Sequence, residues 1–363
     1  MSTYNFWKWS TEEDVPKSKR NKENNNLVFP NTNEMFQKDT FDQETIEREL
    51  DWAKDLGFNS LRVYLHDLLW SEKDKFKKTF DRFLNICEKR NIKPIIVLFD
   101  DCHRPYPKLG KQPLPVKGVH NSGWKQSPGM ELVNQVDEEK IDAKELNRLK
   151  EFVQGVLKDY SNDERILMWD VYNEPGQFGI GDKALKLLQY TWDWAFEVRP
   201  SQPLTACLDG AIGDEILKLN GENSDVISFH TYEAEKLEPT IERLKEFERP
   251  LLCTEYMARE FGTTFEFSLP IFKKESVGCY NWGFVAGKSQ THFGWSTILE
   301  LQEKKKKEKF NSLPSPNNKL TARTLLIFFG KTDVHPAHVY FWDSLGCHLS
   351  ASLGSQLTFS RRC

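Results

Sequence analysis

Short apolar segments alternate with longer amphipathic segments from about residue 27 to about residue 295. The apolar segments are rich in β-branched, aromatic and Leu side chains and carry few charges. This composition is typical of strands that are buried on both faces of a parallel sheet. We predict strands at Leu27–Pro30, Ser60–Leu65, Pro94–Phe99, Ile166–Tyr172, Leu204–Cys207, Val226–Phe229, Leu251–Thr254 and Val277–Trp282.

The segments between these strands place their apolar residues near helical spacing. Gly57, Pro200 and Gly221 stand where such helices are expected to end, because glycine and proline commonly follow helix C-termini. The pattern predicts helices at Phe41–Leu56, Asp74–Arg90, Ala143–Tyr160, Asp182–Val198, Ile212–Leu219, Pro239–Phe247 and about Phe265–Lys274.

Regular alternation of strands and helices predicts the α/β class and, with eight strands, a (β/α)₈ TIM barrel. An open doubly wound sheet is the alternative, but its Gly-rich phosphate turn after the first strand is missing. Leu27–Pro30 carries the weakest strand pattern. If this segment is not a strand, the predicted barrel lacks its first strand.

The two ends of the chain differ in composition from the rest. Residues 1–26 are polar and charged, which predicts a mobile arm. Residues 27–298 form the predicted catalytic domain. Residues 299–363 form an atypical basic tail with ten Lys and Arg against five Asp and Glu. Its start, Leu299–Phe310, could supply the last helix of the barrel, or the tail could be foreign to the domain.

Composition narrows the classes of partner. Aromatic residues make up 13% of the 363 residues, which suits a carbohydrate cleft because sugars stack on flat rings, although aromatics also fill cores. A net charge of −4 argues against nucleic acid. No apolar run approaches the roughly 18 residues that span a bilayer, so we predict no membrane partner. We expect a monomer.

Localisation is left open by the sequence. No signal peptide is visible, and the 7 Cys are scattered without a paired spacing, which indicates reduced thiols. We therefore expect the cytoplasm by default, and an extracellular location if the N-terminus is incomplete.

Two isolated carboxylates, Glu174 and Glu255, each close a predicted buried strand. Active sites of these barrels lie at the C-terminal ends of the strands, and the fourth and seventh strands lie nearly opposite each other. A carboxylate pair facing across the barrel is the machinery of glycoside hydrolysis. Either residue alone could instead be a salt-bridged loop acid.

The segments around these carboxylates resemble a known family. Trp169-Asp170-Val171-Tyr172-Asn173-Glu174-Pro175 resembles the Asn-Glu-Pro signature of the clan A glycoside hydrolases, and Leu251-Leu252-Cys253-Thr254-Glu255-Tyr256 resembles their nucleophile strand. The nearest family is glycoside hydrolase family 5, which includes cellulases and mannanases. The resemblance covers roughly residues 27–295 and fades after Trp295.

The resemblance implies a role for each matching residue. Glu174 would be the general acid/base and Glu255 the nucleophile, with roughly 5–5.5 Å between the two carboxyl groups in a retaining enzyme. Arg62 would keep Glu255 ionised, and Tyr232 would orient it. Asn173 would bind the sugar 2-hydroxyl.

Two more matches complete the implied substrate site. His230 would contact the same region as Asn173, and Trp282 would form the platform under the reactive sugar. Other interpretations stay open: His230 could be a satisfied core histidine, Trp282 could be core packing, and Arg62 could neutralise Asp100 or Asp101.

A long loop, from Asp100 to about Gly129, follows the third predicted strand. Its mixture of polar and aromatic residues favours a substrate lid or subsite wall, although a packed surface loop is the alternative. We expect Asp101, His120 and Trp124 to face the cleft. A metal site built from His66, Asp100, Asp101, His103 and His120 lacks tight ligand spacing, so we predict neither a metal nor a cofactor.

These observations predict a retaining hydrolase that cleaves β-linked bonds of an oligo- or polysaccharide. A catalytically impaired carbohydrate-binding barrel is one alternative. A transglycosylase would share every residue named, and a metal-dependent hydrolase on the same fold would need clustered ligands.

Overall fold

The structure is a computed structural model that describes residues 2–3, 34–110, 112–208, 210–285, 287, 289–311, 339–342, 348–353 and 357–362. The chain divides into two compact units, Met1–Lys304 and Lys305–Cys363. The first unit carries the predicted barrel and is described first.

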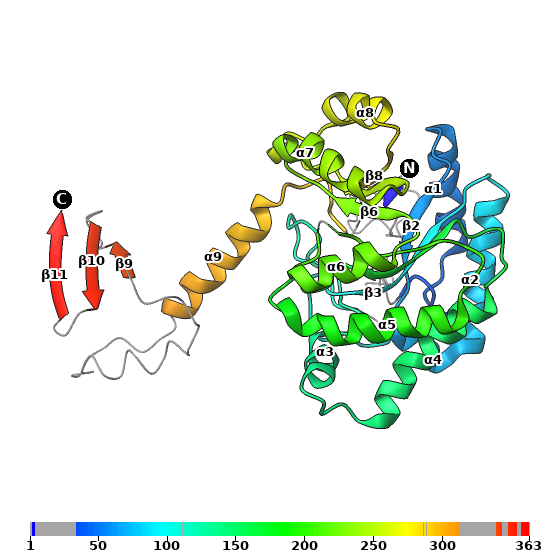
Figure 1. The fold of residues 1–363 in the computed structure, drawn as a ribbon, viewed down its shortest axis with the longest axis horizontal. Coiled ribbons are helices and arrows are strands. Elements are labelled where there is room, and N and C mark those ends of the chain that lie inside the picture. Colours follow the sequence, from blue (N-terminus) through cyan, green and yellow to red (C-terminus); the bar gives the residue numbers. More distant parts are fainter. Residues whose placement is uncertain are drawn as a thin grey trace, which may run out of the picture. The chain divides into compact units, whose positions relative to one another are not determined.

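Eight parallel strands form the centre of the first unit (Figure 1). They pair in the order β5-β4-β3-β2-β1-β8-β7-β6. Two backbone hydrogen bonds of 2.8 Å, from Asp225 N to Leu204 O and from Leu208 N to Ser228 O, join the regions of β5 and β6 and complete the ring. The strands are β1 (Ser2–Thr3), β2 (Leu61–Tyr64), β3 (Ile95–Asp100), β4 (Met168–Asn173), β5 (Leu204–Thr205), β6 (Ile227–His230), β7 (Leu251–Tyr256) and β8 (Gly278–Trp282).

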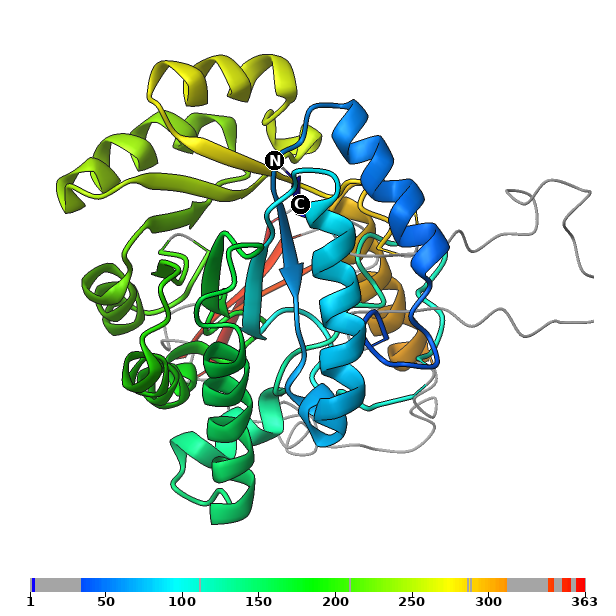
Figure 2. The same ribbon diagram turned by 90° about the vertical axis from the view of Figure 1, so that its right-hand side faces the viewer.

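Helices surround these strands, as Figure 2 shows. The α-helices around the barrel are α1 (Gln43–Asp55), α2 (Lys73–Glu88), α3 (Met130–Asp137), α4 (Ala143–Asp159), α5 (Ala184–Val198), α6 (Asp214–Asn223), α7 (Ala234–Leu244) and α8 (Phe265–Lys274). A further helix, α9 (Ser296–Asn311), begins in the first unit and ends in the second. Short 3₁₀ helices cover Asp67–Glu72, Gly181–Lys183, Lys245–Phe247 and Arg259–Phe261. The predicted (β/α)₈ barrel is thereby confirmed.

Side-chain alternation along the strands separates two apolar cores. Ile96 and Leu98 of β3 pack outward against the helices, in one cluster with Phe80 and Phe83 of α2. Ile95 packs inside the barrel with Met168 and Tyr280. The same alternation turns Arg62 and Tyr64 of β2 inward, toward the site described below.

The barrel differs from the prediction at its first strand. Ser2–Thr3 pairs in parallel with β2 on one side and β8 on the other, so the start of the predicted mobile arm supplies a barrel strand. Leu27–Pro30, which we predicted for this position, and residues 4–26 lie outside the described residues. A segment of two residues is too short to show a hydrophobic pattern, so β1 could not be predicted in this way.

One helix is absent from the predicted set. Helix α3 follows the long loop, in a segment where we predicted no helix. Helix α9 begins at Ser296, close to the predicted start of the last helix. The unit boundary after Lys304 falls inside this helix. The predicted limits of the arm, the catalytic domain and the tail stay predictions.

The second unit contains an antiparallel sheet in the order β11-β10-β9. Its strands are β9 (Val339–Trp342), β10 (His348–Leu353) and β11 (Leu357–Arg362). None of the described helices is long and apolar enough to cross a membrane.

Candidate active site

A cavity of about 470 Å³ opens where the strands end. Asn173 and His230 are the last residues of β4 and β6, and Trp282 is the last residue of β8. The C-terminal edge of the barrel therefore forms its floor. Residues predicted for the site that line this cavity are His120, Trp124, Asn173, Glu174, His230, Tyr232, Glu255 and Trp282.

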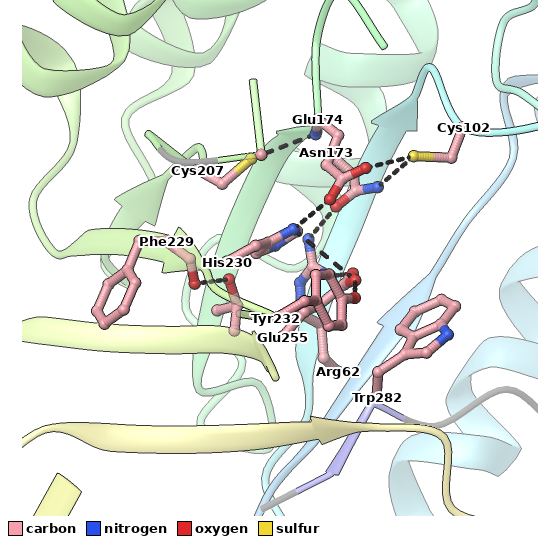
Figure 3. A network of polar contacts seen from close by, with 12 residues as sticks. Arg62, Cys102, Asn173, Glu174, Cys207, Phe229, His230, Tyr232, Glu255 and Trp282 are labelled. Atoms are coloured by element: carbon pink, nitrogen blue, oxygen red, sulfur yellow. Dashed lines mark hydrogen bonds and ion pairs between the residues drawn. The ribbon is translucent and has the colours of Figure 1, made fainter. Parts of the chain in front are cut away.

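Glu174 and Glu255 face each other across this cavity, with His230 between them (Figure 3). His230 Nδ1 lies 2.6 Å from Glu174 Oε1 and 3.7 Å from Glu255 Oε2. One oxygen of Glu174 lies within 4.8 Å of one oxygen of Glu255. Burial lowers the pKa of His230, but the charge of Glu255 and the hydrogen bond to Glu174 outweigh burial and raise it above its ordinary value. The imidazolium form therefore suits this position.

Glu255 is held by three donors. Arg62 Nη1 lies 2.6 Å from Oε1, and the Tyr64 hydroxyl donates to the same oxygen at 2.7 Å. The Tyr232 hydroxyl donates to Oε2. Burial raises the pKa of Glu255, but the charges of His230 and Arg62, together with the two hydroxyl groups, bring it below its ordinary value. Glu255 is thus kept ionised.

Arg62 lies beneath the cavity and does not line it. The guanidinium is fully buried and pairs with Asp170 at 2.7 Å as well as with Glu255. It therefore contacts the carboxylates and not a substrate, and its acidic partners are not Asp100 or Asp101. The sequence did not single out Asp170, because its pairing depends on the register of β2 and β4 across β3.

Glu174 follows β4 with a φ of 43°, in the left-handed region that is strained for a residue with a side chain. Its Oε2 accepts from the thiol of Cys102 at 2.9 Å, and its backbone N–H faces the sulfur of Cys207 at 3.3 Å. Burial raises the pKa of the Cys102 thiol well above its ordinary value, so this group is a donor and not a thiolate. Both oxygens of Glu174 thus have defined partners.

Gly210 closes the space behind this pair. It has a φ of +103°, and a Cβ built on it would lie 2.9 Å from His230 Nδ1 and 3.1 Å from Glu174 Oε1. Only glycine combines that backbone conformation with so close an approach.

Trp282 is oriented by His120. Trp282 Nε1 donates to His120 Nε2 at 3.2 Å, and His120 Nδ1 lies 2.9 Å from the carbonyl oxygen of Phe293. These two contacts require a neutral imidazole with its proton on Nδ1, and burial lowers the pKa of His120 in agreement. The indole N–H is already used, so Trp282 presents its ring and not a donor to the cavity.

The long loop after β3 is a cavity wall and not an isolated surface loop. Gln290, in the loop after β8, accepts from Gly118 N at 2.8 Å and donates to Val116 O and Val119 O at 2.8 and 2.9 Å. Asn121 N donates to Ser289 O at 2.7 Å. The two loops are therefore joined along their length.

Asp101 does not reach the cavity. It is fully buried and accepts from the hydroxyl of Tyr172 at 2.7 Å and from Gly176 N at 2.8 Å. Burial raises its pKa to about 7, although both hydrogen bonds oppose the shift. Adjacent residues at a strand end point to different sides, so Asp100 and Asp101 have different surroundings and the expectation that Asp101 faces the cleft is wrong.

The five residues proposed from the sequence as candidate metal ligands do not form a cluster among the described residues. Among the described residues, the only group close enough to share an ion is Glu174, His230 and Glu255. His66 contacts Asp67 at 2.9 Å and the carbonyl oxygen of Gln126 at 2.9 Å, away from the cavity. Five Cys in the described residues are free: Cys87, Cys102, Cys207, Cys253 and Cys279.

Several cavity residues were not predicted from the sequence. Trp295, Ile298 and Leu299 come from the end of the loop after β8 and the start of α9. Trp295 lies 4.5 Å from Tyr232, ring centre to ring centre. On another side, Phe178, which was also not predicted, packs at 4.4 Å on His103, one of the candidate metal ligands. An aromatic-rich loop after β8 was the available signal, but only the fold shows that it meets the other loops.

Neither a protein-family profile nor a curated protein sequence matches the chain. Solved structures do. The β-mannanase of the blue mussel Mytilus edulis has 16% sequence identity and a TM-score of 0.50, over 74% of this chain and 88% of the mannanase. The endo-β-1,4-mannanase of Thermotoga petrophila has 14% identity and a TM-score of 0.50, over 71% and 67%.

A third similar structure is the exo-β-1,4-mannosidase of an Opitutaceae bacterium, with 14% identity and a TM-score of 0.50, over 72% of this chain and 53% of that enzyme. These neighbours are glycoside hydrolases with TIM barrels. The likeness shows that this chain has the same fold. The resemblance to family 5 of clan A is therefore supported at the level of the fold.

Proposed function

We propose that the protein is a retaining glycoside hydrolase that cleaves β-linked glycosidic bonds of an oligo- or polysaccharide by double displacement. The observation that carries this proposal is the carboxylate pair, with one oxygen of Glu174 within 4.8 Å of one oxygen of Glu255. Retaining enzymes hold their two carboxyl groups about 5–5.5 Å apart, whereas inverting enzymes leave about 6.5–9.5 Å for a water molecule.

In the first displacement, an oxygen of Glu255 attacks the anomeric carbon. The bond between that carbon and the glycosidic oxygen breaks, and Glu174 gives its proton to the departing oxygen. The products are a glycosyl ester on Glu255 and a free alcohol. Arg62, Tyr64 and Tyr232 keep Glu255 charged and aligned for this attack.

In the second displacement, Glu174, now ionised, takes a proton from water. The water oxygen attacks the anomeric carbon, the ester bond breaks, and Glu255 leaves as a carboxylate. His230 supports both steps because its Nδ1 lies 2.6 Å from Glu174 Oε1 in the space between the two acids. Its charge stabilises whichever carboxylate is ionised.

The aromatic walls suit a sugar substrate. Trp282 and Trp124 line one side of the cavity, and Trp295 and Phe261 line another. The indole N–H groups of Trp282 and Trp124 are already bonded to His120 and Asp100, so these two residues offer flat rings, which favour the C–H faces of sugars. The cited neighbours act on β-1,4-mannosidic substrates according to their names. We therefore place β-mannan first in the substrate panel.

The test is the release of reducing sugar from mannan, glucan and xylan. We expect activity that falls at least about 10³-fold in Glu255→Gln, because the nucleophile is lost. Proton NMR of the first product should show retained β configuration. Activity that survives Glu255→Gln, or an inverted first product, would contradict the proposal.

Azide distinguishes the two carboxylates. In Glu174→Ala, azide should restore turnover by attacking the glycosyl ester and should give a β-glycosyl azide. In Glu255→Ala, it should occupy the place of the nucleophile and give an α-glycosyl azide. Sugar binding without any turnover would indicate an impaired binding barrel, and transfer to a second sugar in preference to water would indicate a transglycosylase.

A further inference from the structure

Asp100 is a buried carboxylate that the mechanism above leaves unused. It ends β3, is 3% exposed and does not line the cavity. Its Oδ1 accepts from Asn173 Nδ2 at 2.8 Å and from Cys102 N at 2.9 Å, and its Oδ2 accepts from Trp124 Nε1. All three partners are N–H donors, which a carboxylate satisfies without a proton of its own.

Asn173 is fixed from both ends. Its Oδ1 accepts from Arg62 Nη2 at 2.7 Å, and its Nδ2 donates to Asp100. A guanidinium only donates and a carboxylate only accepts, so one orientation of the amide satisfies both neighbours. Rotation by 180° would set donor against donor at Arg62 and acceptor against acceptor at Asp100.

This orientation determines what Asn173 offers to the cavity. Nδ2 carries two hydrogens, and Asp100 takes one. The second faces Cys102 Sγ at 3.5 Å, a weak acceptor at the cavity wall (Figure 3). A hydroxyl oxygen of a bound sugar is a better acceptor than sulfur at that place.

We propose that Asp100 is a positioning residue for the reaction: it holds the amide of Asn173 so that one N–H faces the 2-hydroxyl of the reactive sugar. The inference rests on the proposed glycosidase function and adds to it the source of this contact. A 2-hydroxyl hydrogen bond strengthens as the transition state forms, so its alignment affects turnover and not binding alone.

The experiment compares an aryl β-glycoside with its 2-deoxy analogue. Glucosides and mannosides share one 2-deoxy analogue, because these sugars differ only at C2. For each variant, kcat/KM on the 2-hydroxy substrate is divided by kcat/KM on the 2-deoxy substrate, after subtraction of spontaneous hydrolysis. A change that only weakens the fold lowers both values and leaves this ratio unaltered.

In Asp100→Ala the ratio should fall about tenfold, the effect of one misaligned hydrogen bond. In Asp100→Asn the ratio should return most of the way to the wild-type value, because the amide oxygen of the new side chain can still accept a hydrogen bond from Asn173. In an Asn173→Ala background, Asp100→Ala should change the ratio no further. The matched control is Asp101→Asn, because the carboxyl of this neighbouring buried residue bonds to Tyr172 and Gly176 and not to the Asn173 amide; it should keep the wild-type ratio.

Melting curves accompany each variant. If Asp100→Ala shows no cooperative thermal unfolding, the same ratio is measured for Asp100→Leu. Leu restores side-chain volume but offers no hydrogen-bond acceptor. A ratio within about twofold of wild type in the folded variant overturns the inference. If the wild-type protein hydrolyses no glycoside in the panel, the proposed function itself fails, and this inference fails with it.

Discussion

Gly210→Ala tests how tightly the acid/base residue is held. The new Cβ would stand 2.9 Å from His230 Nδ1 and 3.1 Å from Glu174 Oε1, whereas ordinary Cβ contacts begin at 3.4 Å. His230 must therefore retreat by about 0.5 Å and Glu174 by about 0.3 Å, if the backbone stays in place. The hydrogen bond between them, now 2.6 Å, would be stretched or turned.

The expected loss follows from these displacements. A misplacement of about 1 Å at a reacting group costs roughly a hundredfold, and a functional constellation tolerates about 0.5 Å. We therefore expect kcat/KM to fall about ten- to a hundredfold. The positive φ of +103° adds backbone strain of about 1–3 kcal/mol, which lowers the melting temperature as well.

Gly57→Ala separates the two effects. Gly57 also has a positive φ, of +82°, but no atom lies within 4 Å of a Cβ built there. This control should lose stability and keep wild-type kcat/KM on an aryl glycoside at 25 °C. If Gly210→Ala stays within about threefold of wild type, or if Gly57→Ala loses as much activity, then contact with the catalytic pair is not what requires glycine.

Three further changes probe the surroundings of the site. The pKa of Asp101, about 7 against an ordinary 3.8, means that the folded state holds a proton more tightly than the unfolded state. Its contribution to stability therefore falls as pH rises from about 4 to about 7. Asp101→Asn should remove this loss, and urea unfolding at pH 5 and at pH 8 should show that the variant gains up to about 2.7 kcal/mol relative to wild type between these two pH values. Tyr64→Phe removes a hydroxyl that lowers the pKa of Glu255, so the acidic limb of kcat/KM against pH should move to higher pH, by about half to one unit; an unmoved limb would contradict this role. His120→Phe leaves the indole N–H of Trp282 without its acceptor, and KM should rise about five- to tenfold while kcat changes less; a loss confined to kcat would point elsewhere.

Most of the barrel could be predicted from periodicity because its strands are buried on both faces. Ile95–Asp100 and Met168–Asn173 are apolar over most of their length, and both were predicted to within two residues at either end. Ser2–Thr3 could not be found in this way, because a two-residue strand has no period. Its strand position is set by β2 and β8 on either side.

The site could be predicted where a polar residue ends a strand, as His230 does, or directly follows one, as Glu174 does. What the sequence could not provide is the orientation of neighbours. Asp100 and Asp101 are identical in type and adjacent, yet one binds Asn173 and the other binds Tyr172. Such a distinction depends on which side of the strand each residue faces and on the register of the next strand.

The joined loops have a consequence for how this pocket can change over time. Gln290 forms hydrogen bonds with backbone groups of Gly118, Val116 and Val119. A deletion in either loop would therefore leave polar groups in the other loop without hydrogen-bond partners. A new substrate preference that needs a different length in one loop therefore needs a compensating change some 170 residues away in the sequence. If loops are grafted from a related barrel, the loop after β3 and the loop after β8 should be transferred together, because one loop alone would lack the hydrogen-bond partners that the other supplies.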